Sequence, residues 1–300
     1  MRTIISAKTD LFAIFGKPIS HAMSPVIHNA AFERSCKDAV MIALESDEKS
    51  FDELFAQFKK ALNFKGFVFT MPVKTAAIKH MEKLSPEAEI IGATNCAVRE
   101  ADGSLTAYNT DSIGFWTAIS EHLHPGSRIE SAFVMGAGGM ARAAIAQLAL
   151  REVRSITAAN RPEDTAFIND YKAFEARLKA RCPKTELKLI PWDPDIWRPY
   201  ISDAQLIANC SANGMNGKGD LGETFPFDAA KADTLFFEAI YEPYITPFIA
   251  RAEELGHPVV HGIELLTHQG ANAFKKWTGV MPDPHQMEED IKSFLAIKKG

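Results

Sequence analysis

The chain has 300 residues, of which 46% are hydrophobic and 24% charged, and its formal net charge is −5. This composition is typical of a soluble globular protein and excludes a disordered or membrane-embedded chain, while the length favours two domains. The acidic balance argues against a nucleic-acid partner, which would require a basic surface. We therefore expect a small-molecule ligand.

The start of the chain, residues 1–6, lacks the long apolar stretch of a secretory signal, and no window reaches the length of a membrane span. We expect a cytoplasmic protein with no membrane partner. The histidines form no H-E-x-x-H pattern, and the cysteines are far apart with no C-x-x-C pair: Cys36, Cys96, Cys182 and Cys210. We predict neither a bound metal nor a disulfide framework.

Strand-like and helix-like runs alternate along the chain, which is the pattern of parallel α/β layers. In the first third, a helix is predicted to begin at Ser24 and Pro25, with the serine as its cap and the proline in its first turn. The other elements predicted there are a buried strand over 11–15, a helix over 51–62, a strand over 66–70 and a turn over 71–74.

In the second part, an apolar strand over 129–135 runs directly into a glycine-rich turn and an alanine-rich helix over 140–150. A late strand is predicted over 233–240, and a helix over 265–277. The order strand, glycine turn, helix is the context that a dinucleotide-binding fingerprint requires.

The turn reads Gly136-Ala137-Gly138-Gly139-Met140-Ala141. The first glycine permits a tight turn, the second lets the backbone approach a pyrophosphate, and the alanine in the third position lets the helix pack closely on the strand. The helix start supplies N–H groups and the positive end of the helix dipole. These features predict a Rossmann domain that binds a dinucleotide.

The choice between NAD and NADP is made at the tip of the next strand, which ends in Asn160 and Arg161. An arginine there can stack on adenine and pair with a 2′-phosphate, which slightly favours NADP. Glu163 and Asp164 follow closely, however, and either carboxylate could bind a ribose hydroxyl. NAD is therefore not excluded.

Further short motifs occur in a fixed order: Gly16 to Pro25, Thr70 to Lys74, Gly92 to Asn95, Asn109 to Phe115, Asn209 to Met215, Tyr241 to Pro247 and Gly262 to Gln269. Together with the glycine turn and the Asn160-Arg161 pair, this set resembles the signatures of the shikimate dehydrogenase family over nearly the whole chain. Several motifs in one order are far more specific than any one of them alone.

The resemblance implies an N-terminal α/β substrate-binding domain over 1–112, completed by helices over 264–300 that pack back on it, and a Rossmann NAD(P)-binding domain over 113–263. It also implies reversible hydride transfer between a nicotinamide and a ring hydroxyl or ketone of a cyclic polyhydroxy carboxylic acid. Shikimate with 3-dehydroshikimate, or quinate, would be the substrate. We expect a monomer or a homodimer.

By the same resemblance, Lys74 and Asp111 would be the catalytic pair. Independent chemistry agrees, because oxidation of an alcohol needs a group that accepts the hydroxyl proton, and a lysine amine can do so. Since the carboxylate would also stabilise the charged ammonium, which of the two is the formal base stays open.

The resemblance assigns five substrate ligands: Ser24, Thr70, Asn95, Tyr241 and Gln269. It assigns the cofactor to the glycine turn and to residues further along the chain: Gly136, Ala137, Gly138, Gly139, Met140, Asn160, Arg161, Ser211, Met215, Gly262 and Leu265.

The chain departs from the family pattern at several positions. Ala22 stands where a serine normally helps to hold the substrate carboxylate, and loss of such a bond costs about 1.5 to 3 kcal/mol. Val68, Cys96 and Glu264 also differ from the usual residues, whereas Glu238 matches a quinate/shikimate variant. Two alternatives remain open: a related ring acid of the aminoshikimate type as substrate, or a non-catalytic homologue that binds a dinucleotide or metabolite.

Overall fold

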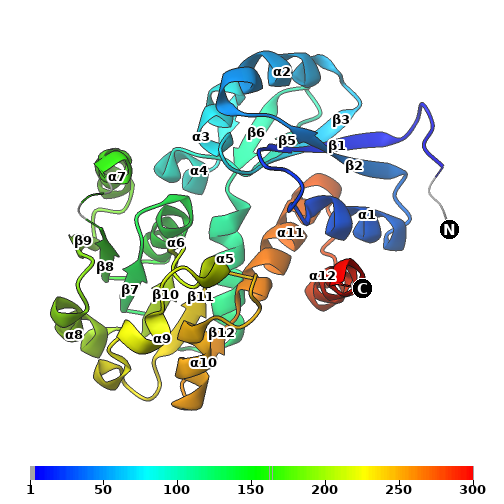
Figure 1. Ribbon diagram of the computed structural model, residues 1–300. Coiled ribbons are helices and arrows are strands. Elements are labelled where there is room, and N and C mark those ends of the chain that lie inside the picture. Colours follow the sequence, from blue (N-terminus) through cyan, green and yellow to red (C-terminus); the bar gives the residue numbers. More distant parts are fainter. Residues whose placement is uncertain (1–3, 162, 164, 300) are drawn as a thin grey trace. The chain divides into compact units, whose positions relative to one another are not determined.

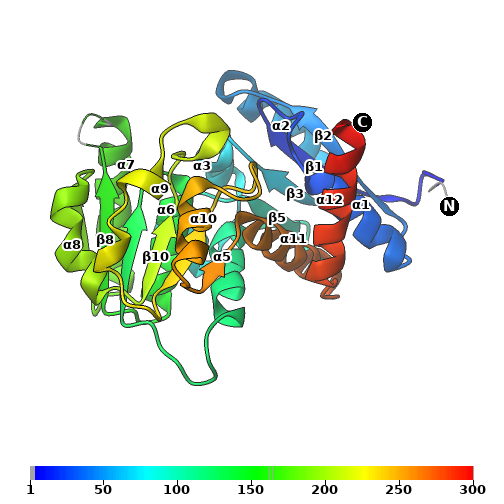
Figure 2. The same ribbon diagram turned by 60° about the horizontal axis from the view of Figure 1, so that its bottom comes forward.

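The computed structural model describes residues 4–161, 163 and 165–299 (Figures 1 and 2). The chain divides into two compact units, one formed by residues 1–110 and 267–300 and the other by residues 111–266. The chain passes between them within helices α5 (Thr110–Glu121) and α11 (Gly262–Thr278). The limits expected for substrate-binding and dinucleotide-binding domains, after residues 112 and 263, stay a prediction.

The first unit contains a six-stranded sheet in the order β2-β1-β3-β5-β6-β4. Its strands are β1 (Asp10–Gly16), β2 (Ala39–Glu45), β3 (Phe64–Phe69), β4 (Lys83–Leu84), β5 (Cys96–Arg99) and β6 (Leu105–Tyr108). This sheet is parallel only in part, because β5 runs antiparallel to both β3 and β6. The physical reason is the short connection 100–104, which can close a hairpin but cannot carry a crossover.

Helices cover both faces of this sheet (Figure 1). They are α1 (Ser24–Arg34), α2 (Glu48–Lys60), α3 (Lys74–Ala77), α4 (Pro86–Ile91), α12 (Pro284–Lys299) and the C-terminal part of α11. Phe51 and Phe55 of α2 pack edge-to-face on Phe15 of β1. On the opposite face, Phe12 meets Phe32 of α1 and Trp277 of α11. The C-terminal helices thus complete the first unit, as the family resemblance implies.

Two helix starts differ in detail from the prediction. Ser24 is the first residue of α1 and not its cap, because Met23 occupies the cap position and offers no side-chain bond. α2 begins at Glu48, three residues before the predicted start, because the Asp47 carboxylate accepts a hydrogen bond from the Ser50 N–H and caps the helix there.

The second unit contains a wholly parallel sheet in the order β12-β11-β10-β7-β8-β9. Its strands are β7 (Ser131–Met135), β8 (Ser155–Asn160), β9 (Glu186–Pro191), β10 (Leu206–Asn209), β11 (Leu235–Glu238) and β12 (Val259–Val260). Numbered within this unit, the order is the 3-2-1-4-5-6 of a Rossmann fold, in which a dinucleotide binds where the strand order reverses. That reversal lies between β7 and β10.

Two layers of helices enclose this sheet (Figures 1 and 2). On one face lie α5, α6 (Gly139–Leu150) and α7 (Thr165–Arg181); on the other lie α8 (Pro194–Asp203), α9 (Leu221–Thr224) and α10 (Pro247–Glu254). Phe115 of α5 packs edge-to-face on Phe237, while its neighbour Phe236 packs on Phe248 of α10. The predicted fold class, two α/β domains of which the second is a Rossmann domain, is confirmed.

Candidate active site

In the first unit, predicted site residues gather at the sheet edge where β3 and β6 end and β5 begins. Thr70 directly follows β3, and its N–H donates to the Phe15 carbonyl of β1 over 2.9 Å. Asn95 directly precedes β5, and its carbonyl accepts from the Phe69 N–H over 2.9 Å. Thr110 follows shortly after β6. One edge therefore carries hydroxyl and amide groups from three strands.

Asn95, Thr110 and Gln269 form a buried polar cluster at this edge. The Asn95 Oδ1 accepts from the Thr110 N–H over 2.6 Å, and the Asn95 Nδ2 donates to the Thr110 Oγ1 over 3.0 Å. The same hydroxyl lies 3.5 Å from the Gln269 Oε1. Two of the predicted substrate ligands are thus oriented through one threonine, which the sequence analysis gave no role. The sequence signal that could have identified Thr110 was its position between Asn109 and Asp111 in one of the family motifs.

Lys74 is held by a tight turn that follows β3. The Val73 N–H donates to the Thr70 carbonyl over 2.9 Å, and the Lys74 carbonyl accepts from the Thr94 N–H over 3.0 Å. Gly16 lies against this turn so closely that a Cβ there would overlap the Thr70 side chain. The glycine therefore allows the turns after β1 and β3 to meet, and Ser24 begins the helix that follows the first of them.

In the second unit, the glycine turn has the geometry that the fingerprint requires. Gly136 has a φ of 114°, and a Cβ there would lie 3.1 Å from the Cys210 carbonyl oxygen. Ala141 is fully buried, while nothing lies within 4 Å of the position of a Gly139 Cβ. Gly138 is the cap of α6. The start of this helix is therefore open to a phosphate group, and the residues fit a dinucleotide.

The tip of β8 carries Asn160 and Arg161 as predicted. The Arg161 guanidinium lies 5.5 Å from the ring centroid of Trp192, which follows the neighbouring strand β9. The Trp192 N–H donates to the Asn160 carbonyl over 2.8 Å, so the two strand tips are bound together. The sequence analysis missed Trp192. Glu163 lies within the described residues, whereas Asp164 lies outside them.

A buried carboxylate lies at the end of β11. Glu238 is 1% exposed and accepts hydrogen bonds from the Asn209 Nδ2, the Thr246 Oγ1 and the Ile240 N–H over 2.8 to 3.1 Å. Burial raises its pKa to about 7, although these donors act in the opposite direction. Sequence reasoning noted Glu238 only as a matching residue. A lone glutamate at the end of an apolar strand was the signal for a role.

Asp111, Tyr241, Ser211, Met215, Gly262 and Leu265 belong to the second unit. Asp111 lies in the first turn of α5, and Tyr241 follows β11, where burial raises its pKa. Gly262 starts α11 against the Ile240 backbone, where a Cβ would overlap the carbonyl group. Lys74 lies in the first unit, so the joint role of Lys74 and Asp111 stays a prediction.

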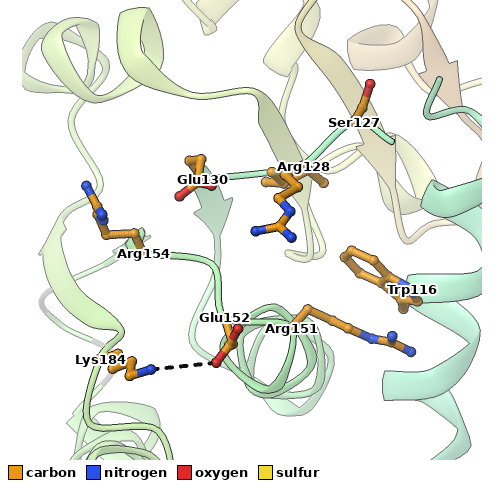
Figure 3. A pocket seen from close by; sticks show the side chains of 9 residues that line it. Trp116, Ser127, Arg128, Glu130, Arg151, Glu152, Arg154 and Lys184 are labelled. Carbon is orange, nitrogen blue, oxygen red and sulfur yellow. Dashed lines mark ion pairs between the residues drawn. The ribbon is translucent and has the colours of Figure 1, made fainter. Parts of the chain in front are cut away.

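A separate hollow of about 690 Å³ lies in the second unit, lined by Trp116, Ser127, Arg128, Ile129, Glu130, Arg151, Glu152, Arg154 and Lys184 (Figure 3). Glu130, Arg154 and Lys184 precede β7, β8 and β9, so it lies at the amino edge of the sheet. Dinucleotides bind at the opposite, carboxyl edge. Glu152 pairs with Lys184 over 3.9 Å, and both side chains are exposed. This hollow is therefore not the cofactor site.

Comparisons with known proteins agree with this geometry. Family models for the shikimate dehydrogenase substrate binding domain and the shikimate 5'-dehydrogenase C-terminal domain match residues 14–97 and 262–292. Among curated proteins, the shikimate dehydrogenase (NADP(+)) of Citrifermentans bemidjiense is 34% identical and covers 97% of each chain. That of Geobacter sulfurreducens is 35% identical and covers 96% of this chain and 97% of its own. The chain belongs to the shikimate dehydrogenase family.

Solved structures of the family show the same fold. The enzyme of Listeria monocytogenes, in complex with shikimate and NAD, has a TM-score of 0.87 at 30% identity and covers 96% of this chain and 98% of its own. A quinate dehydrogenase of Corynebacterium glutamicum with NAD has a TM-score of 0.82 and covers 95% of this chain and 99% of its own. At 24% identity, the latter shows the fold alone.

One departure from the family pattern has a structural explanation. Glu264 lies in the first turn of α11, where its Oε1 accepts from the His261 N–H over 2.8 Å and its Oε2 lies 2.7 Å from the His122 Nε2. The bond to Glu264 raises the pKa of His122. Burial favours a higher pKa for Glu264, but its bonds to His122 and His261 outweigh burial and lower it. Glu264 thus binds α11 to the end of α5.

Across residues 4–161, 163 and 165–299, no helix is long and apolar enough to span a membrane. In that same part of the chain, no group of three or more histidine, cysteine, aspartate or glutamate side chains is placed to hold a metal ion.

Because Glu238 is buried, we expect the difference in stability between the wild type and Glu238→Gln to depend on pH. The pKa of Glu238 rises from 4.5 to about 7 on folding, so the folded state binds its proton more tightly than the unfolded state does. Its contribution to stability is full below the unfolded value and is lost as the pH rises through the folded value. Relative to Glu238→Gln, which cannot ionise, the wild type should lose about 3 kcal/mol of unfolding free energy across this range.

Urea unfolding of both proteins at a series of pH values measures this difference. Because the remaining titratable groups are common to the two proteins, their contributions largely cancel. Parallel stability curves from pH 4.5 to 7 would show that Glu238 does not titrate as its burial requires.

Proposed function

We propose that the protein is an NAD(P)-dependent dehydrogenase. It transfers a hydride reversibly between a nicotinamide and a ring hydroxyl or ketone of shikimate, 3-dehydroshikimate or quinate. The observation that carries the proposal is the set of motif residues at one sheet edge, Thr70, Lys74, Asn95 and Gln269, in a chain that matches curated shikimate dehydrogenases along almost its whole length. The Rossmann order of the second sheet supports the cofactor.

Lys74 and Asp111 handle the proton in this proposal. A bound nicotinamide supplies the hydride acceptor, and the chain must take the hydroxyl proton as the carbinol C–H bond breaks. The turn after β3 fixes the backbone of Lys74, and α5 carries Asp111 in its first turn. Either group can be the formal base, so the role belongs to the pair.

The remaining predicted residues divide by unit. Hydroxyl and amide groups of Ser24, Thr70, Asn95 and Gln269 in the first unit, with Tyr241 in the second, are chemically suited to a ring that bears hydroxyls and a carboxylate. We assign substrate binding to residues 1–112 with 264–300. We assign the dinucleotide to residues 113–263, at Gly136, Ala137, Gly138, Gly139, Met140, Asn160, Arg161, Ser211, Met215, Gly262 and Leu265.

NADP is the favoured cofactor. Arg161 is held over Trp192 at the tip of β8, where a 2′-phosphate would lie in this fold. The two curated relatives described above are named for NADP(+), while an NAD complex is known among the solved structures. A cytoplasmic location and a monomeric or homodimeric state stay predictions.

Two other functions compete with this one, and Ala22 is the observation that favours both. The first is a dehydrogenase for a related ring acid of the aminoshikimate type. The second is a homologue that binds a dinucleotide or metabolite without turnover. Lys74 and Asp111, which the chain retains, argue against the second.

A substrate panel tests the proposed activity. Shikimate, quinate and an aminoshikimate-type acid are each supplied with NADP or NAD, and nicotinamide reduction is followed by absorbance. Lys74→Ala should lower kcat roughly 10²- to 10⁴-fold, as expected when a proton-transfer group is lost. Lys79→Ala is the matched control, because this exposed lysine lies in the helical turn that soon follows Lys74 and pairs with Asp52 of α2. If the wild type turns over no ring acid, the proposed activity is contradicted and the non-catalytic homologue is supported.

A serine at position 22 tests the altered carboxylate contact. Ala22→Ser should lower the KM for shikimate roughly tenfold, because a hydroxyl bond to a charged group contributes about 1.5 to 3 kcal/mol. The KM for the dinucleotide should not change, which serves as the internal control. An unchanged or higher KM for shikimate would show that the pocket no longer holds the carboxylate at this point.

A further inference from the structure

The ends of β10 and β11 each continue into a loop that carries predicted site residues. The loop after β10 contains Ser211 and Met215, which are assigned to the cofactor, and the loop after β11 contains Tyr241, which is assigned to the substrate. The two strands are parallel neighbours, with Asn209 paired to Glu238. The loops therefore begin side by side at the carboxyl edge of the sheet.

The Asn209 side chain holds the first loop. Its Oδ1 accepts from the Ser211 N–H over 3.1 Å and from the Ser211 Oγ over 2.7 Å, while its Nδ2 donates to the Asn213 carbonyl over 3.0 Å. The Ser211 Oγ in turn accepts from the Asn213 N–H over 3.1 Å. The conformation of this loop therefore depends on the orientation of one amide group.

Glu238 fixes that orientation and holds the second loop as well. Its two carboxylate oxygens lie 3.1 and 3.0 Å from the Asn209 Nδ2. Its Oε1 also accepts from the Ile240 N–H over 3.0 Å, and its Oε2 accepts from the Thr246 Oγ1 over 2.8 Å. All these neighbours donate, so they match an acceptor with two oxygens and no proton.

Two further segments pack against the same loops. Gly136 of the glycine turn lies against the Cys210 carbonyl, and Gly262 at the start of α11 lies against the Ile240 carbonyl. In the second loop, Thr246 caps α10, since its Oγ1 accepts from the Ile249 N–H. The positions of these segments are consequently tied to the conformations that Glu238 fixes.

We infer that Glu238 is a positioning residue, an inference that rests on the proposed function. Glu238 holds the Ser211 loop and the Tyr241 loop in one arrangement. As a result, this unit presents its cofactor-binding and substrate-binding groups together. The Glu238 carboxylate acts through Asn209 and Thr246 and does not itself touch substrate or cofactor. A buried carboxylate is otherwise costly, and this one accepts hydrogen bonds from Asn209, which holds the Ser211 loop, and from Ile240 and Thr246 of the Tyr241 loop.

Glu238→Gln and Thr246→Val test the inference. The first replaces one acceptor oxygen with an amide that opposes the surrounding donors. The second removes the tether to the Tyr241 loop, together with the bond that caps α10. Glu238→Gln should raise the KM for the ring acid and that for the dinucleotide, each roughly tenfold, the usual effect of losing a bond to a charged group. Thr246→Val should raise the KM for the ring acid more than the KM for the dinucleotide. Thr246→Ser keeps the hydroxyl, so both KM values should stay at the wild-type level.

Thr234→Val is the matched control for stability. Thr234 is buried just before β11 begins, and its hydroxyl donates to the Ala204 carbonyl over 3.1 Å. This variant should lower the urea unfolding midpoint and leave both KM values unchanged. If Glu238→Gln and Thr246→Val behave in the same way, the carboxylate only stabilises the fold and the inference is overturned.

Calorimetric binding of NADP separates this inference from the proposed function. If the wild type binds NADP but turns over no ring acid, the proposed function fails while the dinucleotide part of the inference can still be measured. Glu238→Gln should then weaken NADP binding roughly tenfold. Equal affinities of wild type and variant would overturn the inference.

Discussion

A carboxylate removed from water needs hydrogen-bond donors, and the second unit supplies several of them to Glu238. The carboxylate is almost completely buried, and it accepts hydrogen bonds from Asn209 at the end of β10 and from Thr246 in the loop after β11. Because Asn209 also holds the Ser211 loop and Thr246 belongs to the Tyr241 loop, the two loops cannot move independently. Gly136 and Gly262 allow the glycine turn and the start of α11 to pack against the same loops. The carboxyl edge of the Rossmann sheet is thus ordered by one electrostatic constraint.

The first unit is ordered mainly by apolar packing. Its sheet is fixed by aromatic packing on both faces, with Phe15 against α2 and Phe12 against Trp277. A buried polar cluster lies at one edge of this sheet, where Asn95 and Thr110 satisfy each other and lie beside Gln269. An apolar sheet with a small hydrogen-bonded edge is typical of a ligand site whose few polar groups set orientation and specificity.

Much of the architecture could be predicted from the sequence, because apolar runs and glycine positions are local signals. The strand before Gly136, the helix after it and the strand that leads to Thr70 were predictable in this way. The return of the C-terminal helices to the first unit followed only from the family resemblance. The antiparallel direction of β5 was not, since a strand four residues long has no directional signature in its own sequence.

The candidate site was predictable only in part. Residues within motifs could be named in advance, but the partners that orient them could not, because those partners depend on strand pairing. Trp192 meets Arg161 only because β8 and β9 are neighbours, and Glu238 meets Asn209 only because β11 pairs with β10. Thr246 joins that contact from eight residues further along the chain. Sequence motifs identify the site residues, but the pairing of distant strands determines which side chains surround them.

The most direct measurement for the central claim is the fate of the hydrogen on the carbinol carbon. Shikimate and quinate carrying deuterium at the ring carbon that bears the reacting hydroxyl are incubated with the protein and NADP, and the products are examined by mass spectrometry. The account predicts deuterium on the reduced nicotinamide and a ketone in the ring acid. Recovery of the label in unchanged acid, with no deuterium on the nicotinamide, would contradict it.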